Sequence, residues 1–268
     1  MLRDITIGQY YPADSVLHRL DPRTKLFGTL IFIISLFMCD SVATYAYMVA
    51  FLAIVISLSK VPFSFMVRGL KAIVFIVALS TIFNLFLTPG EIVARFWIFT
   101  ITKEGIKYAI FIVIRIVLLV IGSSIMTLTT TPKSLTDGLE RSLGFLKVLK
   151  VPVHEIAMMM SIALRFIPIL VEETDRIMKA QMARGADFES GNLMHRIRAM
   201  IPILVPLFIS AWRRAMDLAT AMEARCYHGG EGRTKMHPLK YGWHDHVSYV
   251  ICLFYLGYMI ELRFLARM

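Results

Sequence analysis

The sequence lacks the signatures of a catalytic protein. It contains three cysteines, Cys39, Cys226 and Cys252, which are scattered and odd in number, so neither a disulfide framework nor a CxxC metal site can be built. It has no Walker A run and no Gly-rich phosphate loop, so we expect that this chain does not hydrolyse ATP itself. A G-x-S-x-G elbow and the paired carboxylates of a membrane prenyl-transfer enzyme are also missing.

Charge is scarce as well. Charged residues make up 18% of the chain and hydrophobic residues 57%, and the mean hydropathy is +0.66. This composition indicates an α-helical membrane protein, with more charge than a bundle lying wholly in lipid would carry. The net charge of +10 fits an excess of Lys and Arg on cytoplasmic segments. Nucleic-acid binding is disfavoured, because no basic run is interleaved with exposed aromatics. No cleavable signal peptide is expected, because residues 1–25 lack an apolar stretch.

Apolar stretches predict five membrane spans. Residues 26–58 are apolar except near Asp40, and since one span needs about 20 residues, they form two short spans with a tight turn there. Residues 91–105 are expected to be an outer loop or a partly inserted segment, with Phe96, Trp97 and Phe99 as an interfacial belt. The other expected spans are residues 72–87, 106–128 and 247–265.

Arg115 lies within the fourth expected span, where a cation must find a partner or reach the interface. We favour a structural contact at depth over a place on a transport path.

Residues 129–240 differ in character from the spans. Their helices are apolar on one seam and charged elsewhere, with favourable i,i+4 pairs such as Glu172 with Arg176. This predicts an interfacial or water-exposed domain of three amphipathic helices, a short one at 133–149 and two long ones. The expected fold is thus an all-α membrane protein with four spans in residues 1–128, this domain at 129–240, and a last span in 241–268. We expect the N-terminus and the amphipathic domain in the cytoplasm.

The two long helical patterns end in the same motif. The first runs from Pro152 to Ala183-Arg184-Gly185, and the second from about Arg196 to Ala224-Arg225-Cys226. Both also carry Ile-Pro-Ile-Leu-Val, at residues 167–171 and 201–205. From proline to motif arginine is 184 − 168 = 16 residues in the first and 225 − 202 = 23 in the second, a difference of about two helical turns.

The motif arginines have two interpretations. Gly185 suits the residue that ends a helix with positive φ, and Arg184 in the last turn is favoured by the helix dipole. An arginine on a rigid helix end is also a good fork for a carboxylate-lined groove. The second copy has Cys226 in place of glycine, so its helix could continue to Gly229-Gly230.

Methionines concentrate in the same region, with nine of 17 between residues 150 and 226. Ordinary packing is the default explanation, but Met-rich surfaces also suit contact with several partners. The candidate contact residues are Met158, Met159, Met160, Met200 and Leu204. The short cluster His244-Asp245-His246 has no further ligands near it in sequence, and we interpret it as an interfacial cap rather than a metal site.

Three stretches carry a family resemblance. They are Ser15-x-Leu17-His18-x-Leu20-Asp21-Pro22-Arg23-Thr24-Lys25, Leu164-Arg165-Phe166-Ile167-Pro168 and Gln181-Met182-Ala183-Arg184-Gly185-Ala186. Together they resemble the transmembrane T components of energy-coupling factor transporters, over nearly the whole chain.

The resemblance implies a non-catalytic subunit of an importer in a prokaryotic cell membrane. It implies two ATP-binding cassette ATPases in the cytoplasm, which bind the ATP, and a membrane S component that binds a vitamin or another micronutrient. It also implies that Arg184 and Arg225 dock into the two ATPases, while the long helices pass motion to the S component. The unequal lever lengths would suit non-identical ATPases. A conventional binding-cassette permease with its own substrate path, or a membrane-embedded metal enzyme using His244 and His246, is the alternative.

Overall fold

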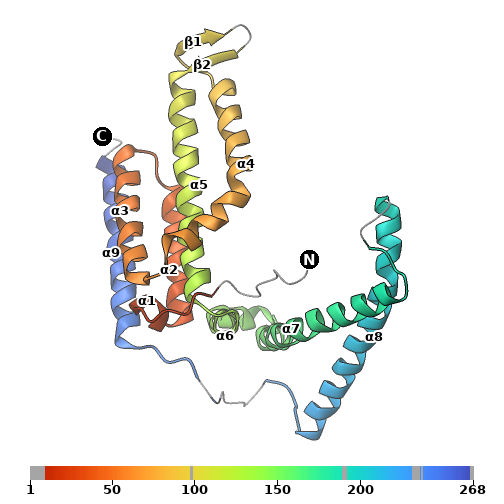
Figure 1. The fold of residues 1–268 in the computed structure, drawn as a ribbon. Helices are drawn as coiled ribbons and strands as arrows, with labels where there is room; N and C mark the ends of the chain where they lie inside the picture. The colour runs from red at the N-terminus through yellow and green to blue at the C-terminus, as the bar shows by residue number, and fades with distance from the viewer. Residues whose placement is uncertain (1–9, 97–98, 189–191, 231–235, 237, 266–268) are drawn as a thin grey trace. The chain divides into compact units, whose positions relative to one another are not determined.

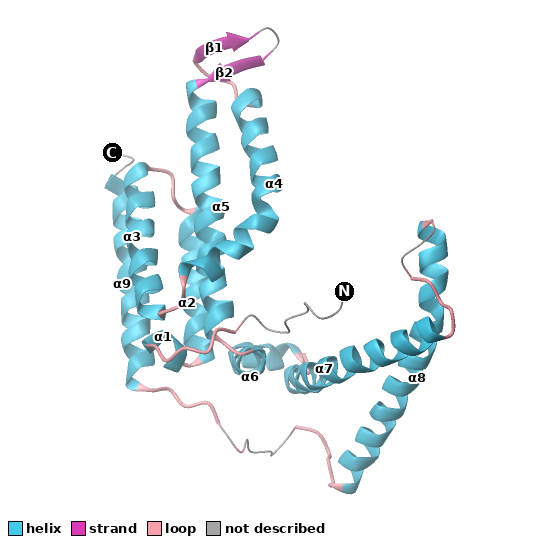
Figure 2. Ribbon diagram, viewed as in Figure 1, coloured by secondary structure: helices cyan, strands magenta, loops and turns pink. Residues whose placement is uncertain are grey.

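The protein is helical apart from one hairpin in the part of the chain described by a computed structural model (Figures 1 and 2). The described residues are 10–96, 99–188, 192–230, 236 and 238–265. In order the elements are α1 (Val16–Arg19), α2 (Pro22–Phe37), α3 (Val42–Ser59), α4 (Phe63–Leu87), β1 (Ile92–Phe96), β2 (Phe99–Thr102), α5 (Lys103–Thr129), α6 (Pro132–Ser142), a 3-10 helix η2 (Leu143–Leu149), α7 (Val153–Ala183), α8 (Leu193–Ala224) and α9 (Trp243–Leu265). The expected all-α membrane fold is confirmed.

The described chain divides into two compact units. The bundle unit contains residues 10–138 and 239–265, and the long-helix unit contains residues 139–238. Within the described residues the chain passes between the two units twice, at residues 138/139 and 238/239.

The bundle unit is built from α2, α3, α5 and α9, with α4 packed along α5 (Figure 1). Its core is apolar and continuous, and the stacked rings of Tyr47, Phe51 and Tyr255 join α3 to α9. The buried core residues are Ile31, Phe32, Leu36, Cys39, Tyr45, Met48, Leu52, Val61, Met66, Leu118, Ile121, Ile125, Leu128, Tyr255 and Met259.

The tight turn at Asp40 is present and joins α2 to α3, of which only α3 is long enough to count as a candidate span. Ser41 caps α3, because its hydroxyl accepts from the Thr44 N–H while its own N–H donates to the Thr44 hydroxyl. The turn therefore has a local cause as well as a polar composition.

Five described helices are long and apolar enough to cross a membrane: α3, α5, α7, α8 and α9. The number agrees with the sequence prediction, but the members differ. With 16 residues, α2 is shorter than these five helices. The helix α4 is bent by 61° between residues 63–71 and 73–86, and it is a sixth candidate if the bent pair is counted as one span. The long helices α7 and α8 qualify because their proline-containing halves are almost free of charge.

Two local expectations are corrected. Residues 91–105, expected as a loop or inserted segment, form an antiparallel hairpin of β1 and β2 leading into α5; Trp97 lies outside the described residues. Residues 133–149, expected as one amphipathic helix, are α6 followed by the tighter helix η2. The segment of η2, Leu-Gly-Phe-Leu-Lys-Val-Leu, offers no run of polar residues to continue the solvent face of α6.

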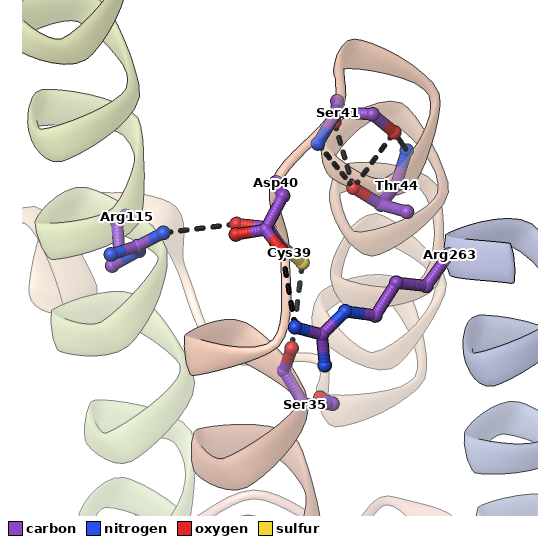
Figure 3. A network of polar contacts seen from close by, with 7 residues as sticks. All are labelled: Ser35, Cys39, Asp40, Ser41, Thr44, Arg115 and Arg263. Carbon is purple, nitrogen blue, oxygen red and sulfur yellow. Dashed lines mark hydrogen bonds and ion pairs between the residues drawn. The ribbon is translucent and has the colours of Figure 1, made fainter. Parts of the chain in front are cut away.

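Arg115 makes a structural contact in the bundle unit (Figure 3). Its guanidinium donates from Nη2 to the Cys39 carbonyl at 2.9 Å and from Nε to the Tyr45 hydroxyl at 3.1 Å. From α9, Arg263 donates to the Asp40 carboxylate at 3.2 Å. Two arginines from different helices thus hold the α2–α3 turn, and the first of them satisfies a carbonyl left free beyond the end of α2.

Candidate functional site

The first predicted tip, Ala183-Arg184-Gly185, ends α7 in a Schellman motif. The Ala186 N–H donates to the Gln181 carbonyl and the Gly185 N–H to the Met182 carbonyl, both at 3.0 Å. Gly185 has φ +89°, in the region that favours glycine. The chain therefore reverses directly after Arg184, which leaves this arginine at an exposed helix end.

The second tip, Ala224-Arg225-Cys226, has the same geometry, although it lacks the glycine. The Tyr227 N–H donates to the Met222 carbonyl at 3.1 Å and the Cys226 N–H to the Glu223 carbonyl at 2.9 Å. Cys226 takes φ +55°, which costs an L-residue about 1 kcal/mol. The suggestion that α8 continues to Gly229-Gly230 is wrong, because this hydrogen-bonding pattern stops the helix at Ala224.

Both arginines are exposed. Within the described residues neither guanidinium takes part in a hydrogen bond or ion pair, so each fork is available to another molecule. From the sequence, a role at the helix end and a role in docking are both open for these arginines. In the structure, backbone hydrogen bonds close both helix ends, so neither arginine side chain is needed as a cap.

The helices α7 and α8 run antiparallel in the long-helix unit. The Arg214 Nη2 of α8 lies 3.5 Å from the Glu173 Oε2 of α7. The Gln181 side-chain amide of α7 donates to the Pro202 carbonyl of α8 at 3.3 Å. The Pro202 carbonyl is free because residue 206 is also proline and has no N–H to donate four residues on. Proline spacing in the sequence could have indicated this free carbonyl, but not its partner Gln181.

The contact between Gln181 and Pro202 also shows how far apart the two tips lie. Arg184 lies one turn beyond Gln181 and so near Pro202, whereas Arg225 lies 225 − 202 = 23 residues further along α8. At about 1.5 Å per residue this is roughly 35 Å, more than the width of one groove contact.

The predicted apolar contact residues lie on exposed surface. Met159, Met160, Met200 and Leu204 are 57%, 41%, 54% and 56% exposed, and Met158 is half-buried. On α8 they belong to a longer exposed apolar stripe at helical spacing. The stripe comprises Ile197, Met200, Ile201, Leu204, Val205, Phe208, Ile209, Trp212 and Met216. Packing inside this chain therefore does not account for these side chains.

Asp21 organises the first of the resembling stretches. The Asp21 carboxylate caps α2 by accepting a hydrogen bond from the Arg23 N–H. It also accepts two hydrogen bonds of 2.9 Å from the Arg23 guanidinium. Burial disfavours its charged form, but the bonds from Arg23 outweigh burial and lower the pKa of Asp21 below its usual range. This stretch is therefore a capped helix start, and the cap is part of a larger network.

The cluster His244-Asp245-His246 is a cap, as expected. The buried Asp245 accepts from the Asp21 and Gly242 N–H groups, both at 2.8 Å, while His244 and His246 are exposed. Among the described residues, no group of three or more His, Cys, Asp or Glu could hold a metal ion.

Several helices are long and apolar enough to cross a membrane, and their ends are polar. These features define a multi-pass α-helical membrane protein. The chain belongs to the CbiQ family, whose model, described as cobalt transport protein, matches residues 13–236. It is 51% identical over 253 residues to a protein of Acidaminococcus fermentans, with 94% of each chain covered. It is 50% identical over 264 residues to one of Ruminiclostridium cellulolyticum, covering 98% of this chain and 99% of the relative, and 48% identical over 261 residues to one of Bacillus subtilis, covering 97% and 98%.

All three relatives are named energy-coupling factor transporter transmembrane protein EcfT. The resemblance found in the sequence is confirmed. The chain is a non-catalytic transmembrane component of an energy-coupling factor transporter.

Proposed function

We propose that this chain couples ATP hydrolysis by two cytoplasmic ATPases to movement of a substrate-binding S component in the membrane. The observation that carries the proposal is the pair of arginine tips, built with one backbone geometry on two helices. Because the tips lie roughly 35 Å apart along α8, one small groove cannot take both, and two docking sites are needed. ATP belongs to the partner ATPases in this proposal, and this chain holds no cofactor.

Each tip suits a groove lined with carboxylates. A guanidinium offers a planar fork of donors, and the Schellman turn fixes the backbone from which it extends. We assign Ala183-Arg184-Gly185 to one ATPase and Ala224-Arg225-Cys226 to the other. The different spacing from proline to arginine, 16 and 23 residues, suits two non-identical subunits.

The S component is assigned to the exposed apolar surface of α7 and α8. Met159, Met160, Met200 and Leu204 present flexible or branched apolar side chains that fit a membrane partner of variable shape. The rest of this surface lies against the lipid bilayer. The substrate, a vitamin or another micronutrient, is then recognised by the S component.

The long-helix unit is placed on the cytoplasmic side, because residues 133–240 carry the charged faces and an excess of cations. The chain would then lie in the plasma membrane of a prokaryotic cell with its N-terminus inside.

A permease with its own substrate path is the second candidate. The bundle unit has a cavity of about 540 Å³ between α2, α3, α5 and α9, but its lining is almost wholly apolar. The Lys25 ammonium in the lining donates to the His18 and Thr129 carbonyls. Such a cavity offers few polar groups to a hydrophilic substrate, and the coupling role is preferred.

Cys226 is a natural reporter for the proposed docking and orientation. It is exposed beside Arg225, whereas Cys39 is buried, and Cys252 is half-buried and can be changed to serine. A membrane-impermeant maleimide should label Cys226 in inside-out vesicles and not in intact cells. Co-expressed ATPases should slow this labelling. Labelling of intact cells would reverse the orientation, and a rate unaffected by the ATPases would remove the docking assignment.

A further inference from the structure

The two chain crossings within the described residues both lie next to residues 21–25 of the bundle unit. The outgoing crossing follows Gly138, near the middle of α6, and the returning crossing precedes Tyr241. Residues 138 and 241 are far apart in sequence, yet each contacts the start of α2.

The outgoing crossing is held by close packing. Gly138 is buried, and a Cβ built on it would lie 2.8 Å from Cβ of Pro22 and 3.5 Å from the Arg23 nitrogen. A proline ring cannot turn away, so only glycine allows this approach of α6 to α2. The Lys25 ammonium adds a bond of 2.8 Å to the Thr129 carbonyl, at the end of α5 and just before α6.

The returning crossing is held by charge and an aromatic ring. The Arg23 guanidinium lies 3.8 Å from the centre of the Tyr241 ring, within range of a cation–π contact. Asp245 then joins the Gly242 N–H to the Asp21 N–H, both at 2.8 Å. Asp21 and Arg23 are themselves locked together, with side chains only 2% and 15% exposed.

We propose that Asp21, Arg23 and Lys25 are positioning residues, which anchor both chain crossings so that movement of the arginine tips is transmitted and not absorbed. A lever transmits displacement only if its base is fixed, and this network holds the bundle-unit residues at which the described chain leaves for the long-helix unit and returns from it. The inference rests on the proposed coupling function and adds to it the location of the fixed base.

The test loosens the anchor without removing its charged pair, because loss of Arg23 would leave Asp21 buried and unpaired. Gly138→Ala forces α6 away from Pro22, and Gly144→Ala is its matched control, since a Cβ at residue 144 meets nothing within 4 Å. Tyr241→Leu removes the aromatic face above Arg23, and Tyr241→Phe keeps it.

The complex with its ATPases and S component is reconstituted in liposomes, with benzoylphenylalanine inserted at position 200 as a photo-crosslinker. Two quantities are measured in each variant: the ATPase rate, and the change in crosslinking to the S component caused by adding ATP. In Gly138→Ala and Tyr241→Leu we expect that change to fall at least threefold while the ATPase rate and the amount of assembled complex stay within twofold of wild type. Gly144→Ala and Tyr241→Phe should match wild type in both.

An ATP-dependent change that is unaltered in both loosened variants overturns the anchor. So does one that falls only in step with the ATPase rate and assembly, because that pattern is a general loss of structure. Failure of the coupling function itself is distinguishable, since the wild-type chain would then assemble with no ATPase or show no ATP-dependent change.

Discussion

The two units differ in how much of their structure they support by themselves. The continuous apolar core lies entirely in the bundle unit. In the described part of the long-helix unit the buried hydrophobic residues are Val153, Ala157 and Ile203. In the apolar windows of α7 and α8 only 11% and 6% of residues are buried within the chain, against 28% for α3 and 33% for α5 in the bundle unit, whose outer helix α9 has 11%. One unit is a scaffold with its own packing, and the other presents apolar and cationic surface that partners and lipid must cover.

The largest expected effect is on the long-helix unit. In an Arg184→Ala, Arg225→Ala double variant each lost contact should cost about 2–5 kcal/mol of docking free energy, so neither ATPase should co-purify. Arg→Lys should rescue poorly, because an ammonium cannot reproduce the planar fork. Expression and membrane insertion should remain near wild type, as the bundle core is untouched. Arg213→Ala, an exposed arginine elsewhere on α8, is the control. Full ATPase binding by the double variant would show that the tips only end helices.

The second largest effect is expected on the stability of the bundle unit, and it can be measured without any partner protein. Asp21→Ala should lower the free energy of unfolding by about 3 kcal/mol, toward the lower end for buried pairs because Arg23 keeps some solvent contact. Thermal unfolding of the purified chain measures it. Asp14→Ala removes the equally short but exposed pair with Arg19 and should change nothing measurable. Equal effects would mean that burial does not distinguish the two pairs.

The same pair gives a pH dependence. Because the pKa of Asp21 is lower in the folded protein than in the unfolded chain, its stabilising contribution is complete above the unfolded value, near pH 4. It is lost as the pH falls through the folded pKa. Unfolding curves between pH 3 and 6, measured for wild type and for Asp21→Asn, should therefore converge at the acid end.

A smaller effect is expected on the apolar stripe of α8. Leu204→Ala and Met200→Ala should each weaken S-component retention by about 1–2 kcal/mol, since they remove apolar area from the contact. ATPase co-purification should not change. Thr220→Ala, exposed on the same helix, serves as the matched control. Unchanged retention in both variants would mean that lipid, not the S component, covers the stripe.

The smallest effect is expected on the stability of the two helix ends, and it compares the two tips directly. Gly185→Ala should destabilise the end of α7 by about 1 kcal/mol, because alanine avoids positive φ. Cys226→Gly should stabilise the end of α8 by a similar amount. Hydrogen exchange of the Ala186 and Tyr227 amides, which close the two turns, reports these changes in opposite directions.

The sequence was a good guide where the signal is local. Apolar run length predicted the spans α3, α5 and α9, but not the apolar halves of α7 and α8, and both tips were found because their residues are contiguous. The hairpin at residues 92–102 was missed, because its strands are short and flanked by span sequence, so an apolar stretch there does not distinguish strand from inserted segment. The geometry of Cys226 was misjudged for a related reason: a non-glycine residue at positive φ is held by hydrogen bonds that composition does not reveal.

The sequence by itself determined that the chain is a helical membrane protein with two arginine-tipped helices, because hydropathy, helical period and capping act over a few neighbouring residues. Only the tertiary structure decided which distant groups meet. The Arg23 guanidinium over the Tyr241 ring, Asp245 on the Asp21 N–H, Gly138 against Pro22 and Gln181 on the carbonyl freed by Pro206 are such contacts. The two residues of each contact are separated by at least 21 and at most 224 positions in the sequence. No periodicity along the chain encodes such a pairing, because it arises only when the helices pack.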